Sequence, residues 1–174
     1  MTPTPIEGDP VDEQKMVEIE LGRIVLRDHS VAAPQHILLR EIDGERSFPI
    51  VIGFPEASEI QRLVTGVKTE RPMTHQLLHD TIVSLGARLA TVDIIDIRHN
   101  TFYAKLMLEN EAGEPVAVLD ARPSDSIALA LRAKCPLRIS ETVLDLVRTD
   151  ESADKIEDES EESPPDSTPD MPSF

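Results

Sequence analysis

Apolar and polar residues alternate along the first part of the chain, as they do in half-exposed β-strands. Between residues 17 and 26 aliphatic side chains recur at alternate positions on either side of Gly22. This pattern predicts a long strand that is bent or bulged at the glycine. Two further apolar runs, at 36–42 and 48–52, flank the Asp43-Gly44 pair. An Asp-Gly pair between two such runs predicts a hairpin.

After the third run the apolar spacing changes to three and four residues, which is the period of a helix. Pro55 suits the first turn of this first helix, and Gly66 suits its C-cap. After a loop at 67–73, Thr74 is expected to N-cap a second helix that Gly86 closes. The side chains expected on the buried face of the second helix are Leu77, Leu78, Ile82 and Leu85.

The second half of the chain predicts another hairpin and the remaining helices. Two long apolar runs meet at His99-Asn100, where the chain is expected to turn. A short run, Val116 to Leu119, predicts a buried strand, and a helix rich in small and aliphatic residues follows it directly. The segments expected here are strands at 88–98, 101–108, 116–119 and 137–139 and helices at 123–133 and 141–148.

The order of these elements indicates the fold class. It runs three strands, two helices, three strands, a helix, a short strand and a short helix, and hairpins outnumber βαβ crossovers. We therefore expect a single compact α+β domain with a mostly antiparallel or mixed sheet and three main helices. This domain is predicted to span residues 16–148, between a disordered leader at 1–15 and a disordered acidic tail at 149–174.

The negative charge of the chain is concentrated at its ends. The net charge is −16, and residues 149–174 carry ten acidic side chains and one basic side chain. Residues 16–148 are nearly balanced, with 19 acidic and 15 basic side chains. The tail cannot bury enough apolar surface to offset the entropy lost on ordering. It is either a solubilising extension or a mimic of nucleic acid that occupies a binding face.

The composition also indicates where the protein works. The single cysteine, Cys135, excludes an intramolecular disulfide framework and fits a reducing compartment. No apolar run reaches the ~18–20 residues of a membrane span, and the N-terminal residues lack the pattern of a signal peptide. We therefore expect a soluble, cytoplasmic protein without a membrane partner.

Several common functional motifs are missing from the sequence. It contains no P-loop, no GxGxxG or GxSxG motif and no zinc-type Cys/His cluster. With no Trp, one Tyr and no basic stripe, it does not resemble a purely electrostatic nucleic-acid binder. Binding of phosphates through a bound metal ion remains compatible with this composition, because the ion supplies the positive charge.

Polar groups crowd one junction between a strand and a helix, in the segment from Asp120 to Asp125. Ligands gather at strand ends in open α/β sheets, so this junction is a candidate site. The two carboxylates suit Mg²⁺ or Mn²⁺, and Arg122 suits bidentate binding of a phosphate. Helix capping explains Ser124 and Asp125 equally well, but it does not require Asp120, which precedes the helix.

Ionisable residues also occupy the starts of the two other main helices. His75 lies in the first turn of the second helix beside Arg71 and Thr74, at a position where anions bind readily. Glu56 holds the corresponding place in the first helix. Each has a simpler explanation, as a polar first-turn residue or as an acid that complements the helix dipole. These residues form one site only if the fold brings the three helix starts together.

Four ordered motifs resemble the bifunctional nuclease domain family of bacteria and plants. They are Phe48-Pro-Ile-Val-Ile-Gly53 with Glu56, Arg71-Pro-Met-Thr-His75, Thr101-Phe-Tyr-Ala104, and the segment from Asp120 to Arg132. The resemblance covers about residues 16–145. It implies a compact α+β domain, capable of self-association, with nuclease activity on DNA and RNA. Gln76 stands after the motif histidine, where the family pattern often has Asp.

The residues and the resemblance together predict a nuclease that depends on a divalent metal ion, Mg²⁺ or Mn²⁺, and acts on DNA, RNA or both. The expected catalytic residues, with histidine as general base, are His75, Asp120, Arg122 and Asp125. The expected substrate-binding residues are Arg71, Thr74 and Ser124. The expected metal ligands are Glu56, Asp120 and Asp125. The alternative is a non-catalytic, homo-oligomeric binding or regulatory module in which the motif residues build helix caps and subunit contacts.

Overall fold

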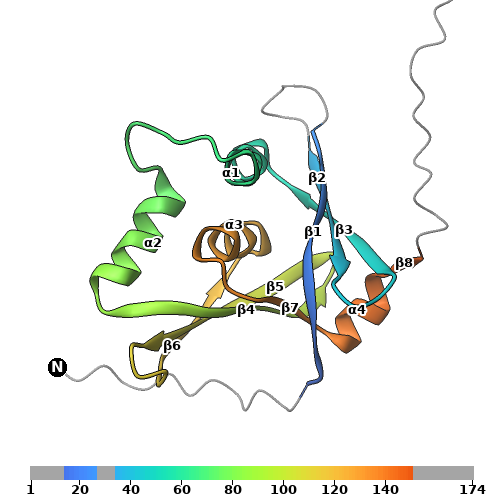
Figure 1. Ribbon diagram of the computed structural model, residues 1–174. Helices are drawn as coiled ribbons and strands as arrows, with labels where there is room; N and C mark the ends of the chain where they lie inside the picture. The colour runs from blue at the N-terminus through green and yellow to red at the C-terminus, as the bar shows by residue number, and fades with distance from the viewer. Residues whose placement is uncertain (1–13, 27–33, 151–174) are drawn as a thin grey trace, which may run out of the picture.

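The structure, a computed structural model, describes residues 14–26 and 34–150 (Figure 1). Its strands are β1 (Met16–Val25), β2 (Gln35–Glu41), β3 (Arg46–Ile52), β4 (Ala87–Arg98), β5 (Thr101–Asn110), β6 (Pro115–Ala121), β7 (Leu137–Ser140) and β8 (Thr149–Asp150). Its helices are α1 (Phe54–Thr65), α2 (Thr74–Ser84), α3 (Pro123–Ala133) and α4 (Glu141–Val147). The predicted α+β class is confirmed, with the three main helices and the short fourth one.

One sheet contains the eight described strands, in the order β6-β5-β4-β7-β1-β2-β3-β8. Neighbours are antiparallel except β4 and β7, which run parallel, so the sheet is mixed. Both predicted hairpins are present, as β2–β3 and β4–β5. His99 and Asn100 have φ of 48° and 59°, and positive φ at both positions suits a two-residue turn that follows the strand twist. The pairing of β1 shifts register between Leu21 and Arg23, which is the bulge predicted at Gly22.

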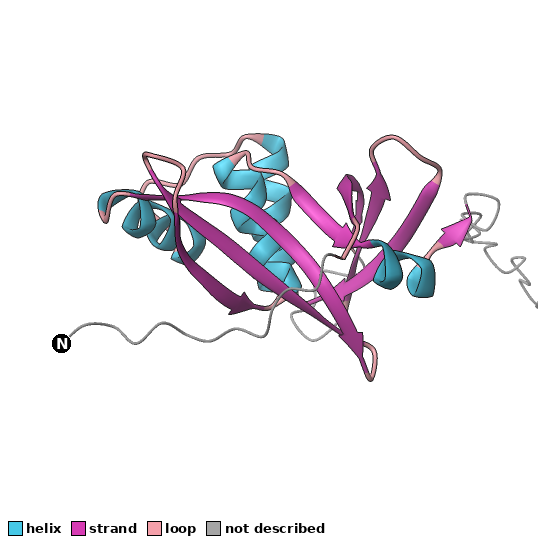
Figure 2. Cartoon of the chain, turned by 90° about the horizontal axis from the view of Figure 1, so that it is seen from below, coloured by secondary structure: helices cyan, strands magenta, loops and turns pink. Residues whose placement is uncertain are grey.

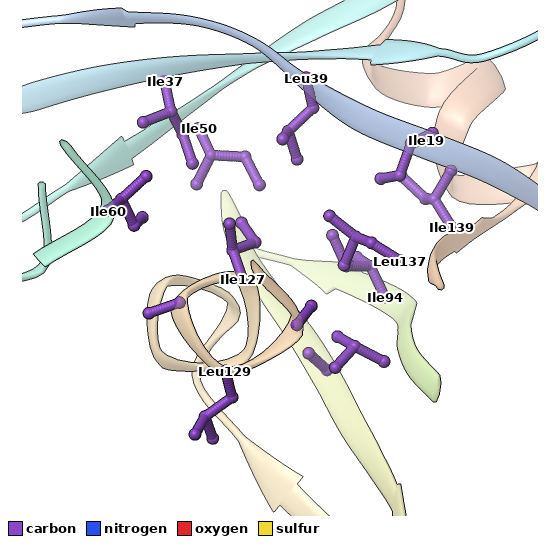
Figure 3. Packing of buried hydrophobic residues seen from close by; sticks show 14 of the residues in the cluster. Ile19, Ile37, Leu39, Ile50, Ile60, Ile94, Ile127, Leu129, Leu137 and Ile139 are labelled. Carbon is purple, nitrogen blue, oxygen red and sulfur yellow. The ribbon is translucent and has the colours of Figure 1, made fainter. Parts of the chain in front are cut away.

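Helix α3 lies at the centre of the fold. In Figure 1 the sheet passes below it and to its right, α1 lies above it and α2 lies to its left. Its residues from Ser124 to Ala130 are all buried except Asp125, which explains why they are small or aliphatic. Figure 3 shows Ile127 directed toward Ile50 of β3 and Ile60 of α1. The core of the molecule therefore forms around α3.

Helix α2 is much less buried than the sequence predicts. Of the four side chains expected on its buried face, only Ile82 is buried, whereas Leu77 is 58% and Leu85 is 80% exposed. The helix packs against α3 and β4 along one line, so the rest of its apolar surface faces outward. Its N-cap is Met73 and not Thr74, which is the first helical residue. The predicted buried face was wrong for all of these leucines, Leu78 included.

Strand β6 is also exposed, although the sequence predicts a buried strand there. It is the last strand of the described sheet, with β5 as its only strand neighbour. Val116 and Val118 are 56% and 41% exposed. An apolar run of this length does not distinguish a central strand from an edge strand, because both contain the same residue types.

The ends of the domain lie at the side of the molecule away from α2. The backbone carbonyl of Lys15 accepts a hydrogen bond from the N–H of Glu141, and β8 pairs with β3. In Figures 1 and 2, α4 lies at the opposite end of the molecule from α2. The predicted leader and acidic tail fall almost wholly outside the described residues, so the domain boundaries stay predictions. No helix in the described segments is long and apolar enough to cross a membrane.

Candidate active site

The N-termini of α1, α2 and α3 meet at one cleft, and each brings an ionisable side chain to it. Glu56, His75 and Asp125 lie in the first turns of these three helices. Arg122 is the N-cap of α3 and comes directly after β6. All four residues line a cleft of about 740 Å³, which we call the first cleft. The condition that the sequence left open, that the three helix starts come together, is met.

Arg122 links two acids from different helices. Its Nε donates to Oδ2 of Asp125 over 2.8 Å, and its Nη2 donates to Oε1 of Glu56 over 2.7 Å. A further contact from Nη2 to Oδ1 of Asp125 measures 3.2 Å, so the pairing with Asp125 is bidentate. Nη1 has no hydrogen-bond partner among the described residues. The guanidinium therefore keeps donors free for an anion in the cleft.

His75 is held by the same carboxylate. Its Nε2 lies 3.0 Å from Oδ1 of Asp125. Because an ionised carboxylate can only accept, Nε2 carries a proton and donates it, so Nδ1 is the nitrogen that has a lone pair in the neutral form of the ring. Nδ1 has no hydrogen-bond partner in the described part of the chain. An imidazole with one nitrogen fixed by a carboxylate is the arrangement of a general base.

The charges of this cluster stabilise one another. Burial by itself would raise the pKa of Asp125, but the hydrogen bonds from Arg122 and His75 outweigh burial and hold that pKa below its usual range. The hydrogen bonds to Asp125 and Glu56 raise the pKa of Arg122. The ion pair between Arg122 and Asp125 is therefore present throughout the neutral pH range.

Asp120 lines the first cleft but stands apart from the hydrogen-bonded cluster. It lies opposite Lys105 of β5, while its neighbour Leu119 lies opposite the buried Leu106. Because successive side chains of a strand point to opposite faces, the Asp120 carboxylate is on the Lys105 face and not on the face toward α3. It makes no hydrogen bond or ion pair with the described residues.

The three residues predicted to bind substrate lie in different places. Thr74 lines the first cleft beside His75. Arg71 is exposed in the loop before α2 and does not line the cleft. Ser124 is buried and lines a different cleft, which shares Arg122 with the first. The structure brings Thr74 to the cluster and leaves the other two outside it; their roles stay predictions.

The predicted metal ligands do not face one another. Glu56, Asp120 and Asp125 all line the first cleft, but the guanidinium of Arg122 lies between Glu56 and Asp125 and binds both. Within the described residues, no group of three or more His, Cys, Asp or Glu side chains is arranged to hold a metal ion. Mg²⁺ and Mn²⁺ need oxygen ligands directed at the ion, so these residues do not fit a metal while Arg122 occupies this position.

Glu59 also lines the first cleft, although it was not among the residues predicted from the sequence. It is 5% exposed, and its carboxylate binds Arg132 of α3 over 2.8 Å and Arg62 of its own helix. Burial alone would raise the pKa of Glu59, but the two arginines hold it below its usual range. The sequence did contain a signal for Glu59: it lies three residues after Glu56, and residues at this spacing share a helix face.

Fold and site together define an α+β domain in which charged residues from three helix N-termini share one cleft. The family model described as the bifunctional nuclease domain matches residues 37–152, a range that includes the whole cluster. The chain therefore belongs to the bifunctional nuclease domain family. The resemblance read from its four motifs is confirmed.

Two kinds of relatives are similar to this chain. An uncharacterized protein of Mycobacterium tuberculosis is 40% identical over 127 residues, which cover 71% of this chain and 74% of the relative. Bifunctional nuclease 1 of Oryza sativa subsp. japonica is 26% identical over 121 residues, or 68% of this chain and 36% of the relative. Bifunctional nuclease 2 of Arabidopsis thaliana is 27% identical over 106 residues, which cover 60% of this chain and 32% of the relative. The chain thus spans about a third of the length of these plant proteins.

Proposed function

We propose that the protein is a nuclease that hydrolyses phosphodiester bonds of DNA, RNA or both. The observation that carries this proposal is the pairing of His75 with Asp125 beside Arg122 in the first cleft. An imidazole held by a carboxylate can move a proton, and a guanidinium can bind a phosphate. The family description and the names of the plant relatives support the same activity.

In the proposed reaction His75 is the general base. Its Nδ1 takes a proton from a water molecule while the water oxygen forms a bond to phosphorus. The bond from phosphorus to the leaving oxygen breaks, and that oxygen takes a proton from protonated His75 or from solvent. Asp125 accepts the hydrogen bond from Nε2, which fixes the tautomer and stabilises the imidazolium ion.

Arg122 binds the phosphate that is attacked. Its free Nη1 donates to a phosphoryl oxygen and stabilises the negative charge that develops during attack. Glu56 holds the guanidinium through Nη2 and is a positioning residue, because its oxygen touches Arg122 and not the substrate. Thr74 lines the same cleft, and in this reaction its hydroxyl binds a second phosphoryl oxygen.

Cleavage of labelled single-stranded DNA and RNA by the purified full-length protein tests this proposal. We expect His75→Ala to lower the rate by at least about 100-fold, as loss of a general base does. His79→Ala is the matched control, because His79 lies one turn further along α2 and does not line the cleft. Equal activity of the wild type and His75→Ala would indicate a contaminating nuclease and would refute this site.

Dependence on Mg²⁺ or Mn²⁺ is a separate proposal, because the ion needs Arg122 to move away from Glu56 and Asp125. Thermal melting of the His75→Ala variant measures metal binding apart from turnover. If Glu56 is a ligand, either ion raises the melting temperature of this variant but not of its Glu56→Ala derivative. No shift in either protein, together with cleavage that EDTA does not reduce, would refute metal dependence.

A non-catalytic, oligomeric module is the second candidate function. One observation favours it: α2 and β6 expose apolar side chains beside the first cleft, as a surface that contacts another subunit does. Under this alternative the Arg122 pairs are structural. Asp125→Ala would then lower the melting temperature, while wild-type protein would show neither cleavage nor binding of nucleic acid.

A further inference from the structure

A second cleft shares Arg122 with the first, and the proposed reaction leaves it unused. Its volume is about 520 Å³, within the ~300–1,000 Å³ of typical small-ligand sites. Its walls come from the end of β3, the turn between β4 and β5, the start of α3 and the last residue of α4. A group bound there would lie next to a phosphate held by Arg122.

The lining of the second cleft differs in charge from that of the first. Although the chain has a net charge of −16, no Asp or Glu is among the described residues that line the second cleft, and Arg122 is the charged one. Ile52, Ile97 and Phe102 form an apolar wall, and Phe102 is fixed by the buried Phe48, with ring centroids 5.9 Å apart. An aromatic and aliphatic wall beside one cation suits a flat aromatic group that carries a phosphate.

Ser124 supplies an independent observation. It is 8% exposed and lines the second cleft from the first turn of α3. Its hydroxyl makes no hydrogen bond with any residue of the described segments, and α3 has no side-chain cap. Its oxygen is not among the buried polar atoms of the described residues that lack a partner, so it is open to the second cleft and free to bond to a polar ligand atom there. Asn100, in the turn between β4 and β5, adds an amide that both donates and accepts, as the edges of bases do.

We propose that the second cleft binds one unpaired nucleotide of the substrate, next to the phosphate held by Arg122. The base lies against Phe102 and Ile52, and Ser124 and Asn100 form its hydrogen bonds. A base inside a duplex is paired and stacked and cannot enter such a cleft. The substrate class is therefore single-stranded DNA or RNA. This inference rests on the proposed function for the role of Arg122.

Binding of AMP to the full-length protein, measured by calorimetry, tests the nucleotide site. Thr101→Trp places a large ring in the cleft from an exposed strand position, and we expect AMP affinity to fall at least tenfold. Ser124→Ala removes one hydrogen bond and is expected to weaken binding about fivefold. Ser126→Ala is the matched control, because it removes a buried hydroxyl of the same helix that lines neither cleft. Circular dichroism verifies that each variant is folded.

Inorganic phosphate is the second probe, because it reaches Arg122 without a base. We expect phosphate to bind at least tenfold more weakly than AMP and to be insensitive to Ser124→Ala. Equal affinities for phosphate and AMP would overturn the proposal. So would an AMP affinity that Thr101→Trp and Ser124→Ala leave unchanged.

Cleavage kinetics separate this inference from the proposed function. Single-stranded and double-stranded substrates of one sequence are compared, and we expect Thr101→Trp to raise KM for the single strand at least tenfold. Equal cleavage of both substrates with an unchanged KM in Thr101→Trp would leave the nuclease standing and overturn the nucleotide site. AMP binding that depends on Ser124, without any cleavage, would support the site and refute the nuclease.

Discussion

Among single residues, Asp125 explains most about the candidate active site. The sequence left open whether its carboxylate caps α3 or serves a reaction. In the structure both of its oxygens accept hydrogen bonds from the side chains of Arg122 and His75, and the N-terminus of α3 has no side-chain cap. Capping therefore does not account for Asp125.

The stability of the Asp125 pairing is expected to depend on pH. Folding lowers the pKa of Asp125, so its contribution to the free energy of unfolding is complete above its unfolded pKa of about 3.9 and is lost as the pH falls through the folded value. We expect Asp125→Asn to cost about 1–2 kcal/mol at pH 7 and progressively less below about pH 4. Urea unfolding at several pH values measures this, with the exposed Asp80→Asn as control. A cost that is constant from pH 7 to pH 3 would contradict it.

Cys135 is expected to be unreactive in the folded protein. Burial raises the pKa of its thiol to about 11, so at pH 8 its thiolate fraction is about a hundredfold below that of a free cysteine. The rate of reaction with Ellman's reagent measures this fraction. Unfolding in guanidinium should restore the fast reaction, and an equally fast reaction of the native protein would contradict the prediction.

Among the helices, α2 and α3 show how similar apolar content leads to different burial. Both carry aliphatic residues at helical spacing, yet α3 is surrounded by the sheet, α1 and α2, whereas α2 packs along one line. Helices α1 and α3 are also joined by charge, through Glu56 with Arg122 at one end and Glu59 with Arg132 at the other. These two contacts hold the N-terminus of α3 in place beside His75.

Glu59 is expected to stabilise the packing of α1 on α3. Its loss leaves the half-buried Arg132 without its counter-charge, so we expect Glu59→Gln to lower the free energy of unfolding by about 3 kcal/mol. Glu20→Gln is the control, because it breaks an exposed pair with Arg40 and should cost less than about 1 kcal/mol. Urea unfolding of both variants gives the comparison, and similar costs would contradict a structural role for Glu59.

For the molecule as a whole, the outward faces of α2 and β6 remain to be accounted for. More than half of the side-chain surface is exposed at Leu77 and Leu85 of α2 and at Val116 of β6. The outer edge of β6 is unpaired in the described sheet. An unpaired edge strand beside an apolar helix suits a second copy of the same surface, since two such edges can pair with each other.

Self-association through this surface is therefore expected. Light scattering after size-exclusion chromatography should give a dimer or larger for the wild type, and a Leu77→Glu, Leu85→Glu variant should shift toward the monomer. Val64→Glu, which adds the same charge at an equally exposed position on α1, should leave the mass unchanged. A monomeric wild type would refute the prediction.

Most of the elements followed from local signals in the chain. The alternation from residue 17 onward, Asp43-Gly44, His99-Asn100 and Gly66 each act on neighbouring residues, so strands, turns and helix ends could be predicted from them. The prediction failed for Leu77 and for Val116, because periodicity shows which residues share a face but not whether another element covers that face. Both lie at the edge of the molecule, where no further element of the described fold packs over them.

The chemistry of the candidate site depended on long-range contacts. The residue types and their places at helix starts were visible in the sequence, since helix N-termini have local signals. The packing of α1 and α2 on α3 brings Glu56 to Arg122 and His75 to Asp125. The register of β5 with β6 places Asp120 opposite Lys105. Contacts between residues 15 to 66 positions apart arise only when the chain is folded, because no local rule relates them.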